Sequence, residues 1–394
     1  MTETAEWIFW GGITLVIYSY FVYPLLLLLV TALSKIGHGR DRKSRYNTRD
    51  LSEQTDLPEV TVVISAFNEE ASIADRITNL LSQEYPPNKL KILIGSDGST
   101  DATGSILQMQ NSLRVIGVEY SVNRGKASVL NDLLADVETE LVVFTDANTH
   151  FAPDAVKKLV RHFSDPRVGA VSGELHLMSE TDDDNKDVLY WRYERFLKLR
   201  ESMLDAMLGV NGAIYAIRRE LFTPLPTNTI VDDYHLSMEI VKNGYSLMYD
   251  PEAMAWEKCA PNISEEIRRR IRIGIGNYQV FFRMPWALNP LLGWRFISYI
   301  SHKVIRWFTP HILLLTIFLN LLLMTRPIYL ALLIFQLLFY CSAWIGLRIH
   351  RSGKRIPSFL MVVVFFVSMN CSLLRGFLLY VTSDLQGNWQ RTER

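Results

Sequence analysis

A run of roughly 25 residues without a charged side chain, Ile8 to Leu33, lies near the start of the sequence and favours an apolar surrounding along its whole length. As a helix, a run of this length crosses a hydrocarbon core of about 30 Å. The charged side chains before it are Glu3 and Glu6, and the flank after it is basic, with Lys35, Arg40, Arg42, Lys43 and Arg45. The positive-inside rule therefore places the following segment in the cytoplasm. A cleaved signal peptide is the alternative, but the run is too long and lacks a preceding basic segment.

Three more apolar stretches lie near the C-terminus and are long enough to span a membrane: Phe308–Met324, Ile328–Leu347 and Phe359 to about Val381. Ahead of them, Leu291–Trp307 mixes aromatic and basic residues, which predicts a helix in the headgroup plane. The basic loop Arg348–Arg355 is expected in the cytoplasm, and counting spans then places the C-terminus outside. Arg375 leaves a second option open, because a charge inside a span is costly. If the last stretch is re-entrant, the basic tail Arg391–Arg394 stays inside.

The middle of the chain has the pattern of a soluble α/β domain. Short β-branched runs alternate with segments whose apolar residues recur at helical spacing, such as Ile73, Ile77 and Leu80. The runs are Val60–Ser65, Lys91–Ser96, Arg114–Glu119, Glu140–Thr145 and Val168–Gly173. This alternation predicts a mostly parallel sheet with helices on both faces, which binds ligands at the C-terminal ends of its strands. With 41 basic and 41 acidic residues, no overall field favours nucleic acid as a partner.

Polar clusters follow the predicted strands where such a sheet binds its ligand. They are Ser65–Glu70, Ser96–Asp101, Asn123–Lys126, Asp146–Asn148 and the pair Asp232 and Asp233. Each alone is compatible with an ordinary turn or helix cap. Their recurrence at successive strand ends predicts one shared site. A dinucleotide-binding enzyme is disfavoured, because G-x-G-x-x-G is absent after the first strand, which is followed by SAFNEE.

The segments VISAFNEE, GSDGSTDAT, NRGKASVLN, FTDANT and DDYHLSMEIVKNGYSLMYDPEA resemble the family 2 glycosyltransferases, and in particular their membrane-bound polysaccharide synthases. The resemblance covers about residues 58–279. It implies an inverting transfer of a sugar from a nucleotide diphosphate donor. It also implies a single nucleotide-binding sheet domain of glycosyltransferase A type, flanked here by transmembrane helices.

The resemblance also implies roles for individual residues. Asp97 would contact the donor nucleoside, Lys126 would lie near the same nucleotide, and the first cluster would add Asn68 and Glu69 to the substrate site. Asp146 would be the first acid of a metal-binding D-x-D motif that holds Mg²⁺ or Mn²⁺. A hard cation of this kind takes one or two carboxylates together with phosphate oxygens and water.

The catalytic base implied by the resemblance is Asp233, with Asp232 in the place of the preceding Glu of the family. Inversion requires a base that takes the proton of the attacking hydroxyl. A neighbouring carboxylate disfavours ionisation, so Asp232 is expected to raise the pKa of Asp233.

Two positions depart from the family pattern. Asn148 stands where D-x-D has its second acid, which predicts weaker metal binding through an amide oxygen. The segment equivalent to Q-x-x-R-W begins at Arg269 and ends at Ile273. Arg269 and Arg272 are still expected to bind the diphosphate, because a guanidinium suits bidentate binding. The missing Trp leaves processivity open.

The sequence thus predicts a hexosyl- or N-acetylhexosaminyl-transferase that extends an exopolysaccharide from a UDP-sugar, with its catalytic domain on the cytoplasmic side of the plasma membrane. A transferase acting on a lipid acceptor, and a non-catalytic scaffold or transporter component, are the alternatives. The expected partners are the donor, a saccharide or lipid acceptor and membrane lipids, and an export or regulatory partner is left open. The expected divisions are a membrane anchor (1–34), a basic linker (35–57), the transferase domain (58–283), an interfacial helix (284–307), three membrane segments (308–382) and a polar tail (383–394).

Overall fold

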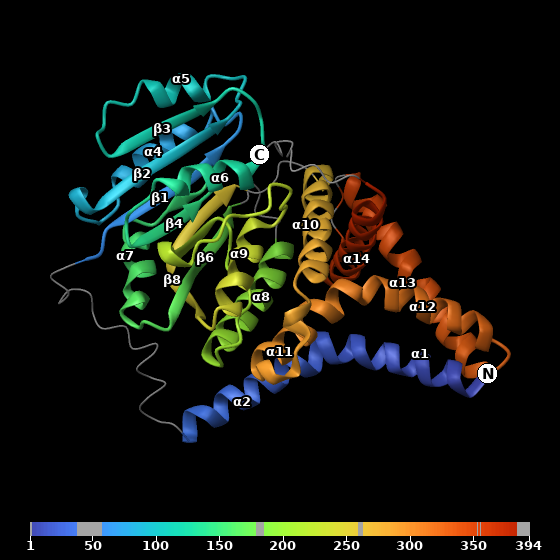
Figure 1. Ribbon diagram of the computed structural model, residues 1–394. Coiled ribbons are helices and arrows are strands. Elements are labelled where there is room, and N and C mark those ends of the chain that lie inside the picture. Colours follow the sequence, from blue (N-terminus) through green and yellow to red (C-terminus); the bar gives the residue numbers. More distant parts are fainter. Residues whose placement is uncertain are drawn as a thin grey trace.

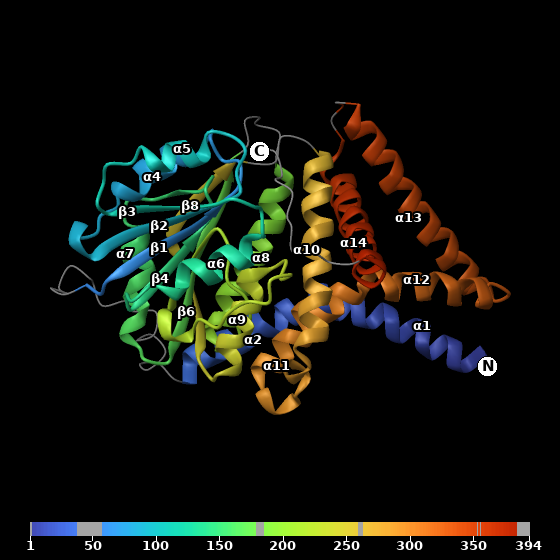
Figure 2. The same ribbon diagram turned by 45° about the horizontal axis from the view of Figure 1, so that its top comes forward.

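The computed structural model describes residues 2–37, 57–178, 185–258, 263–352, 354 and 356–383. Most of the predicted basic linker and all but the first residue of the predicted polar tail lie outside these residues. An α/β domain occupies one side of the molecule, and long helices from both ends of the chain lie together on the other side (Figure 1). Figure 2 shows helices α8 (Asn185–Met203) and α10 (Ile263–Arg283) between the sheet and the last helices of the chain.

The sheet of the α/β domain has the strand order β3-β2-β1-β4-β7-β6-β8-β5. The strands are β1 (Val60–Ala66), β2 (Leu90–Asp97), β3 (Val115–Tyr120), β4 (Leu141–Thr145), β5 (His150–Phe151), β6 (Val168–Met178), β7 (Ile214–Arg218) and β8 (Ser246–Lys258). Strands β1 to β4 pair in parallel, as do β6 and β8, whereas β7 is antiparallel to β4 and β6, and β5 to β8. The mostly parallel sheet expected from the sequence is confirmed. Strands β5 and β8 were not expected.

Helices cover both faces of the sheet because its central strands are apolar on both sides. Every residue of β1 is buried. On one face, Val62 packs with α4 (Ile73–Leu81) and α7 (Ala155–Val160), and on the other, Val63 packs with α6 (Lys126–Ala135) and α9 (Asp232–Lys242). The remaining helices of this domain are α5 (Thr103–Gln108), α8 (Asn185–Met203) and α10 (Ile263–Arg283).

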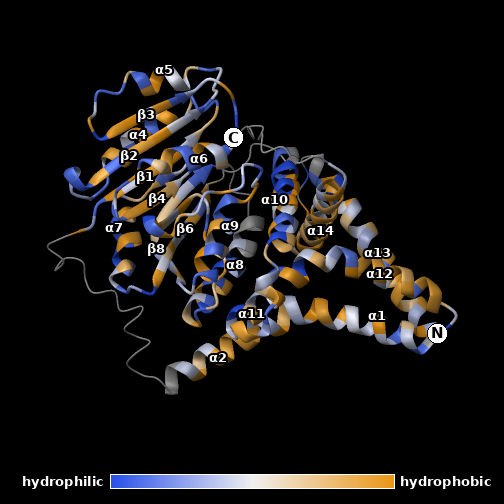
Figure 3. Ribbon diagram, in the orientation of Figure 1, coloured by the Kyte–Doolittle hydropathy of each residue, from blue (hydrophilic) through white to orange (hydrophobic). Residues whose placement is uncertain are grey.

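Within the described residues, four helical segments are long and apolar enough to cross a membrane. The first joins α1 (Thr2–Ile17) to α2 (Tyr23–Gly37) through a π-helical turn, and the second joins α11 (Trp294–Ser298) to α12 (Ile305–Leu323) in the same way. The other two are α13 (Pro327–Arg351) and α14 (Ser358–Thr382). Many of their residues are hydrophobic, as the colouring of the ribbon shows (Figure 3). The segment expected to lie in the headgroup plane therefore continues directly into the first of the three C-terminal spans.

A buried polar network joins the α/β domain to these helices. His302 lies between two acids of α8, with Nδ1 2.8 Å from Glu201 and Nε2 3.0 Å from Glu194. Arg306 donates to the other oxygen of Glu194, and Tyr23 donates to Glu201. Burial alone would raise the pKa of Glu194, but His302 and Arg306 outweigh it and hold this pKa below its usual range. The network fixes the sheet domain against the first and second candidate spans.

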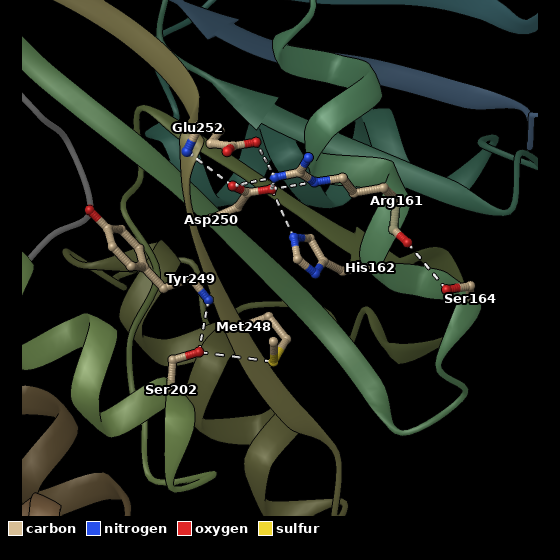
Figure 4. Close-up of polar contacts among 8 residues, drawn as sticks. All are labelled: Arg161, His162, Ser164, Ser202, Met248, Tyr249, Asp250 and Glu252. Carbon is tan, nitrogen blue, oxygen red and sulfur yellow. Dashed lines mark hydrogen bonds and ion pairs between the residues drawn. The ribbon is translucent and has the colours of Figure 1, made fainter. Parts of the chain in front are cut away.

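A second polar cluster lies on β8, and Figure 4 shows its members converging on one buried carboxylate. Arg161 donates two hydrogen bonds to Asp250, at 2.8 and 2.9 Å, and Nε2 of His162 lies 2.8 Å from the same carboxylate. The backbone N–H of Glu252 also donates to Asp250. Burial would raise the pKa of Asp250, but His162 and Arg161 together lower it. This cluster fastens β8 to the end of α7 and the turn that follows it.

Candidate active site

Three elements bring charged side chains together at the C-terminal end of β4. The strand ends at Thr145 and enters a turn in which the backbone N–H of Thr149 donates to the carbonyl of Asp146. Lys126, the first residue of α6, places Nζ 3.0 Å from Asp146 and 3.5 Å from Asp232, the first residue of α9. Burial disfavours the charge on Lys126, but the two aspartates outweigh it and raise its pKa. One ammonium therefore links the predicted metal turn to the predicted catalytic pair.

Asp97 sets the position from which Lys126 reaches these acids. Its side chain is fully buried, and its two oxygens accept the backbone N–H groups of Arg124 and Gly125, each at 2.8 Å. Gly125 adopts a φ of +89°, which a residue with a Cβ rarely tolerates. The structure thus gives Asp97 a role in holding the loop before α6. Its contact with the nucleoside stays a prediction.

Asn68 and Glu69 lie in the loop after β1 and form hydrogen bonds with the segment that follows β2. Asn68 accepts a hydrogen bond from the backbone of Thr100 at 2.8 Å, and its own backbone N–H donates to Ser99. The backbone N–H of Glu69 donates to Thr103 at 2.8 Å. The structure therefore joins the first two predicted clusters, and their contact with the donor remains a prediction.

Asp233 lies beside Asp232 at the start of α9. Burial, and then the charge of Asp232, raise the pKa of Asp233 to about 6, against the opposing effect of Lys126. Asp232 is only 8% exposed, and within the described part of the chain its Oδ2 has no hydrogen-bond donor beyond the ion pair with Lys126. Asp233, a half-buried carboxyl with a pKa near 6, has the property that a general base requires.

The two arginines predicted to bind the diphosphate differ in their surroundings. Arg272 of α10 feels the charges of Asp146, Asp232 and Asp233, and burial lowers its pKa despite them. Arg269, one turn earlier, donates to Glu266 at 3.0 Å. The structure therefore brings Arg272 into the field of the acidic cluster, whereas it engages Arg269 in an ion pair on its own helix.

The sequence did not point to Arg76, a fully buried arginine that lies close to this site. Its Nη2 atom donates to Thr145 at 2.8 Å, and its guanidinium lies 4.2 Å from the centre of the Phe151 ring. Burial lowers the pKa of Arg76 to about 9, while the charge of Asp146 opposes this. The available signal was its spacing, because Arg76 lies on the same helix face as Ile73, Ile77 and Leu80.

Helix α10 also contacts the segment that leads into the predicted catalytic pair, a contact that the sequence did not indicate. Gln279 accepts the backbone N–H of Ile230 at 3.1 Å and donates to the carbonyl of Asn228 at 2.8 Å. A Cβ on Gly276 would lie 2.7 Å from the side chain of Val231, the residue before Asp232. The close approach at Gly276 therefore helps to set where α9 begins.

The matching protein-family model is a glycosyltransferase-like family 2, and it covers residues 58–276. The chain belongs to this glycosyltransferase family. The family resemblance and the enzyme class expected from the sequence are therefore confirmed.

Among curated members, the chain is 24% identical over 274 residues to the poly-beta-1,6-N-acetyl-D-glucosamine synthase of Staphylococcus epidermidis. The alignment covers 67% of this chain and 66% of that protein. The synthase of Staphylococcus aureus strain COL is 25% identical over 270 residues, with 66% of this chain and 65% of the other covered. The chain thus spans slightly less than two thirds of the length of these relatives.

Among solved structures, the fold is similar to that of the mannosyltransferase PcManGT from Pyrobaculum calidifontis, which was solved in complex with GDP-Man and Mn²⁺. The TM-score is 0.64 at 23% identity, and the match covers 91% of this chain and 98% of that one. This likeness confirms the glycosyltransferase A-type sheet with its flanking helices.

Proposed function

We propose that this family member transfers sugar residues, with inversion, from a UDP-sugar to a growing exopolysaccharide. The observation that supports the proposal most directly is that Lys126 forms ion pairs with both Asp146 and Asp232 at one end of the sheet. Asp233 follows Asp232 directly in the chain. These groups supply the two functions that inversion needs, a cationic surface for the leaving diphosphate and a base for the acceptor.

The turn that begins at Asp146 suits a hard divalent cation. It offers the carboxylate of Asp146 and the amide oxygen of Asn148, and such ions take one or two protein oxygens together with phosphate oxygens and water. Among the described residues, no group of three or more His, Cys, Asp or Glu side chains could hold a metal ion by itself, so phosphate oxygens of the donor and water would have to complete the coordination. We therefore assign Asp146 and Asn148 to Mg²⁺ or Mn²⁺, which would offset charge on the leaving nucleoside diphosphate. Lys126 and Arg272 would add positive charge beside it.

Asp233 is assigned as the base. Its carboxylate takes the proton of the acceptor hydroxyl while the hydroxyl oxygen forms the new bond to the anomeric carbon. The bond from that carbon to the diphosphate breaks, and the leaving group departs with the bonding electrons. Burial and the charge of Asp232 raise the pKa of Asp233, and Lys126, which pairs with Asp232, opposes this rise.

The four apolar helices support a place in a membrane, and we propose the plasma membrane with the sheet domain in the cytoplasm. The basic flank after the first span supports this orientation. A nucleotide-sugar donor is accessible there, and the product would leave the site next to the spans.

The test is product analysis with purified full-length protein, Mn²⁺ and each of UDP-N-acetylglucosamine, UDP-glucose and GDP-mannose. The names of the curated relatives make UDP-N-acetylglucosamine the first choice. A polymer from a UDP-sugar is expected. A single sugar on a lipid would favour the lipid-acceptor transferase, and the absence of turnover with every donor would favour the non-catalytic scaffold.

A further inference from the structure

We propose that Glu257 is a positioning residue, which fixes the side-chain amide of Asn148 so that its oxygen serves as the neutral second ligand of the metal turn. This inference rests on the proposed function, because it takes the turn beginning at Asp146 as the cation site. It explains how the site works with an amide where the family motif has an acid.

The contact between the two side chains determines the direction of the amide. Nδ2 of Asn148 donates to Oε1 of Glu257 at 3.1 Å. A carboxylate has no proton to donate, so the nitrogen of Asn148 must face it. The oxygen then lies on the opposite side of the carboxamide, away from Glu257. One hydrogen bond therefore selects the oxygen as the group available to a cation.

The fold places Glu257 beside the turn through a strand pair far from it in sequence. Strand β5 follows the turn directly, and its residue His150 pairs with Trp256 of β8 in antiparallel register. The next residue of β8, Glu257, consequently lies alongside the end of the turn. Its side chain is only 5% exposed, and a buried carboxylate needs hydrogen-bond donors. Asn148 supplies one of them.

Electrostatics favours an amide over an acid at position 148. An aspartate there would set a second carboxylate against the buried Glu257, and like charges at this separation disfavour ionisation of either group. Asn148 avoids that repulsion and keeps an oxygen for the cation. Partners of this kind, which orient a ligand without touching the metal, typically change metal affinity by about 10- to 100-fold.

The first test measures Mn²⁺ binding alone, by electron paramagnetic resonance of free Mn²⁺, in the purified full-length protein without donor. We expect Glu257→Ala to weaken binding by about 10- to 100-fold, because the amide loses its anchor. Glu257→Gln should retain most of the affinity, since its carbonyl oxygen can accept the same hydrogen bond. The matched control is Glu252→Gln, an exposed acid about 16 Å away along the same strand, which should leave binding unchanged.

The second test reverses the hydrogen bond. Asn148→Asp alone should not tighten Mn²⁺ binding, despite restoring the acid of the motif, because the introduced carboxylate would face Glu257. Adding Glu257→Gln should tighten binding at least tenfold relative to Asn148→Asp, since the Gln amide can donate to the new carboxylate. This comparison also decides the matter if Glu257→Ala does not fold.

Three results would overturn the inference. They are unchanged Mn²⁺ binding in Glu257→Ala, tighter binding in Asn148→Asp alone, or an equal loss in Glu257→Gln and Glu257→Ala, which would make Glu257 a direct ligand. Failure of the proposed function gives a different result. The Mn²⁺ pattern would then hold while no sugar is transferred from any donor.

Discussion

The ammonium of Lys126 lies 3.0 Å from a carboxylate oxygen of Asp146 and 3.5 Å from one of Asp232. Three carboxylates of the site are thus coupled through one cation, because the charge of Lys126 also lowers the pKa of the neighbouring Asp233. The loop that aims Lys126 depends in turn on the buried carboxylate of Asp97. The rate of transfer is therefore expected to depend on pH, and mutation of Lys126 is expected to shift this pH dependence.

Replacing Lys126 with Met should move the acid limb of the pH–rate profile to higher pH. Removal of the positive charge raises the pKa of Asp233, so more of the base is protonated at a given pH. On the acid side, the rate falls roughly tenfold for each unit by which this pKa rises. The control is Lys242→Met on α9, where the lysine is exposed and pairs with Glu239. A profile unchanged from wild type would contradict the coupling.

In the wild-type protein, the rate of transfer should rise with pH through about 6 and then level off. A base acts only when deprotonated, and burial together with Asp232 raises the pKa of Asp233 to about 6. Asp233→Asn should lower transfer by roughly 10²- to 10⁴-fold and leave donor binding nearly intact. Asp136→Asn, at an exposed position, serves as the control. Loss of donor binding in Asp233→Asn would refute the role as base.

Asp146→Ala should weaken donor binding that depends on Mg²⁺ or Mn²⁺, because the only carboxylate of the turn is lost. Titration of the donor with and without the metal measures this dependence. Donor binding in the absence of metal should change much less. If the response to metal matches that of the wild type, Asp146 does not belong to the metal site.

Gly276→Ala should slow transfer by up to about 100-fold, with little change in donor affinity. The added Cβ would displace Val231 and shift the start of α9, where Asp233 lies. Gly274→Ala is the matched control on the same helix, since a Cβ there meets its neighbours only at ordinary contact distance, 3.5 Å or more. Adding Val231→Ala to Gly276→Ala should restore the rate. Equal losses in the two glycine variants would exclude this cause.

Asp250→Ala should destabilise the protein by about 3 to 5 kcal/mol, because it leaves Arg161 and His162 without their buried partner. Thermal unfolding of the purified protein measures the loss. Glu252→Gln removes only an exposed partner of Arg161 and should cost about 1 kcal/mol or less.

The same cluster sets an acid limit to stability. The folded-state pKa of Asp250 is below its ordinary value near 4, so its contribution is fully present above about pH 4 and is lost as pH falls below it. A wild type and an Asp250→Ala variant that lose stability equally between pH 5 and pH 3 would contradict this.

Much of the sheet and of the site could be predicted because the signals are local. Residues such as Val62 and Val63, buried on opposite faces, produce the continuous apolar runs of parallel strands, and Asp146 follows one of them directly. The candidate spans could be predicted for the same reason, since uncharged runs of this length have few other uses. Strand β8 was missed because its polar and apolar residues do not form a β-branched run, and because its partners β5 and β6 lie far away in sequence.

The family, the mostly parallel strands β1 to β4 with the polar clusters that follow them, and the apolar helices at both ends could all be predicted from the residues alone. Which charges meet depends on the folded arrangement, because the neighbours of Asp146 come from other elements. Lys126 of α6 donates a hydrogen bond to Asp146, and Arg76 of α4 interacts with the charge of Asp146. Glu257 of β8 accepts a hydrogen bond from Asn148, in the same turn as Asp146. A pKa or a ligand geometry depends on groups within a few ångströms, and sequence spacing does not encode that proximity. For this reason the sequence indicates only that Asn148 stands where the motif has its second acid. The structure shows that Asn148 donates a hydrogen bond to an acid of another strand, Glu257.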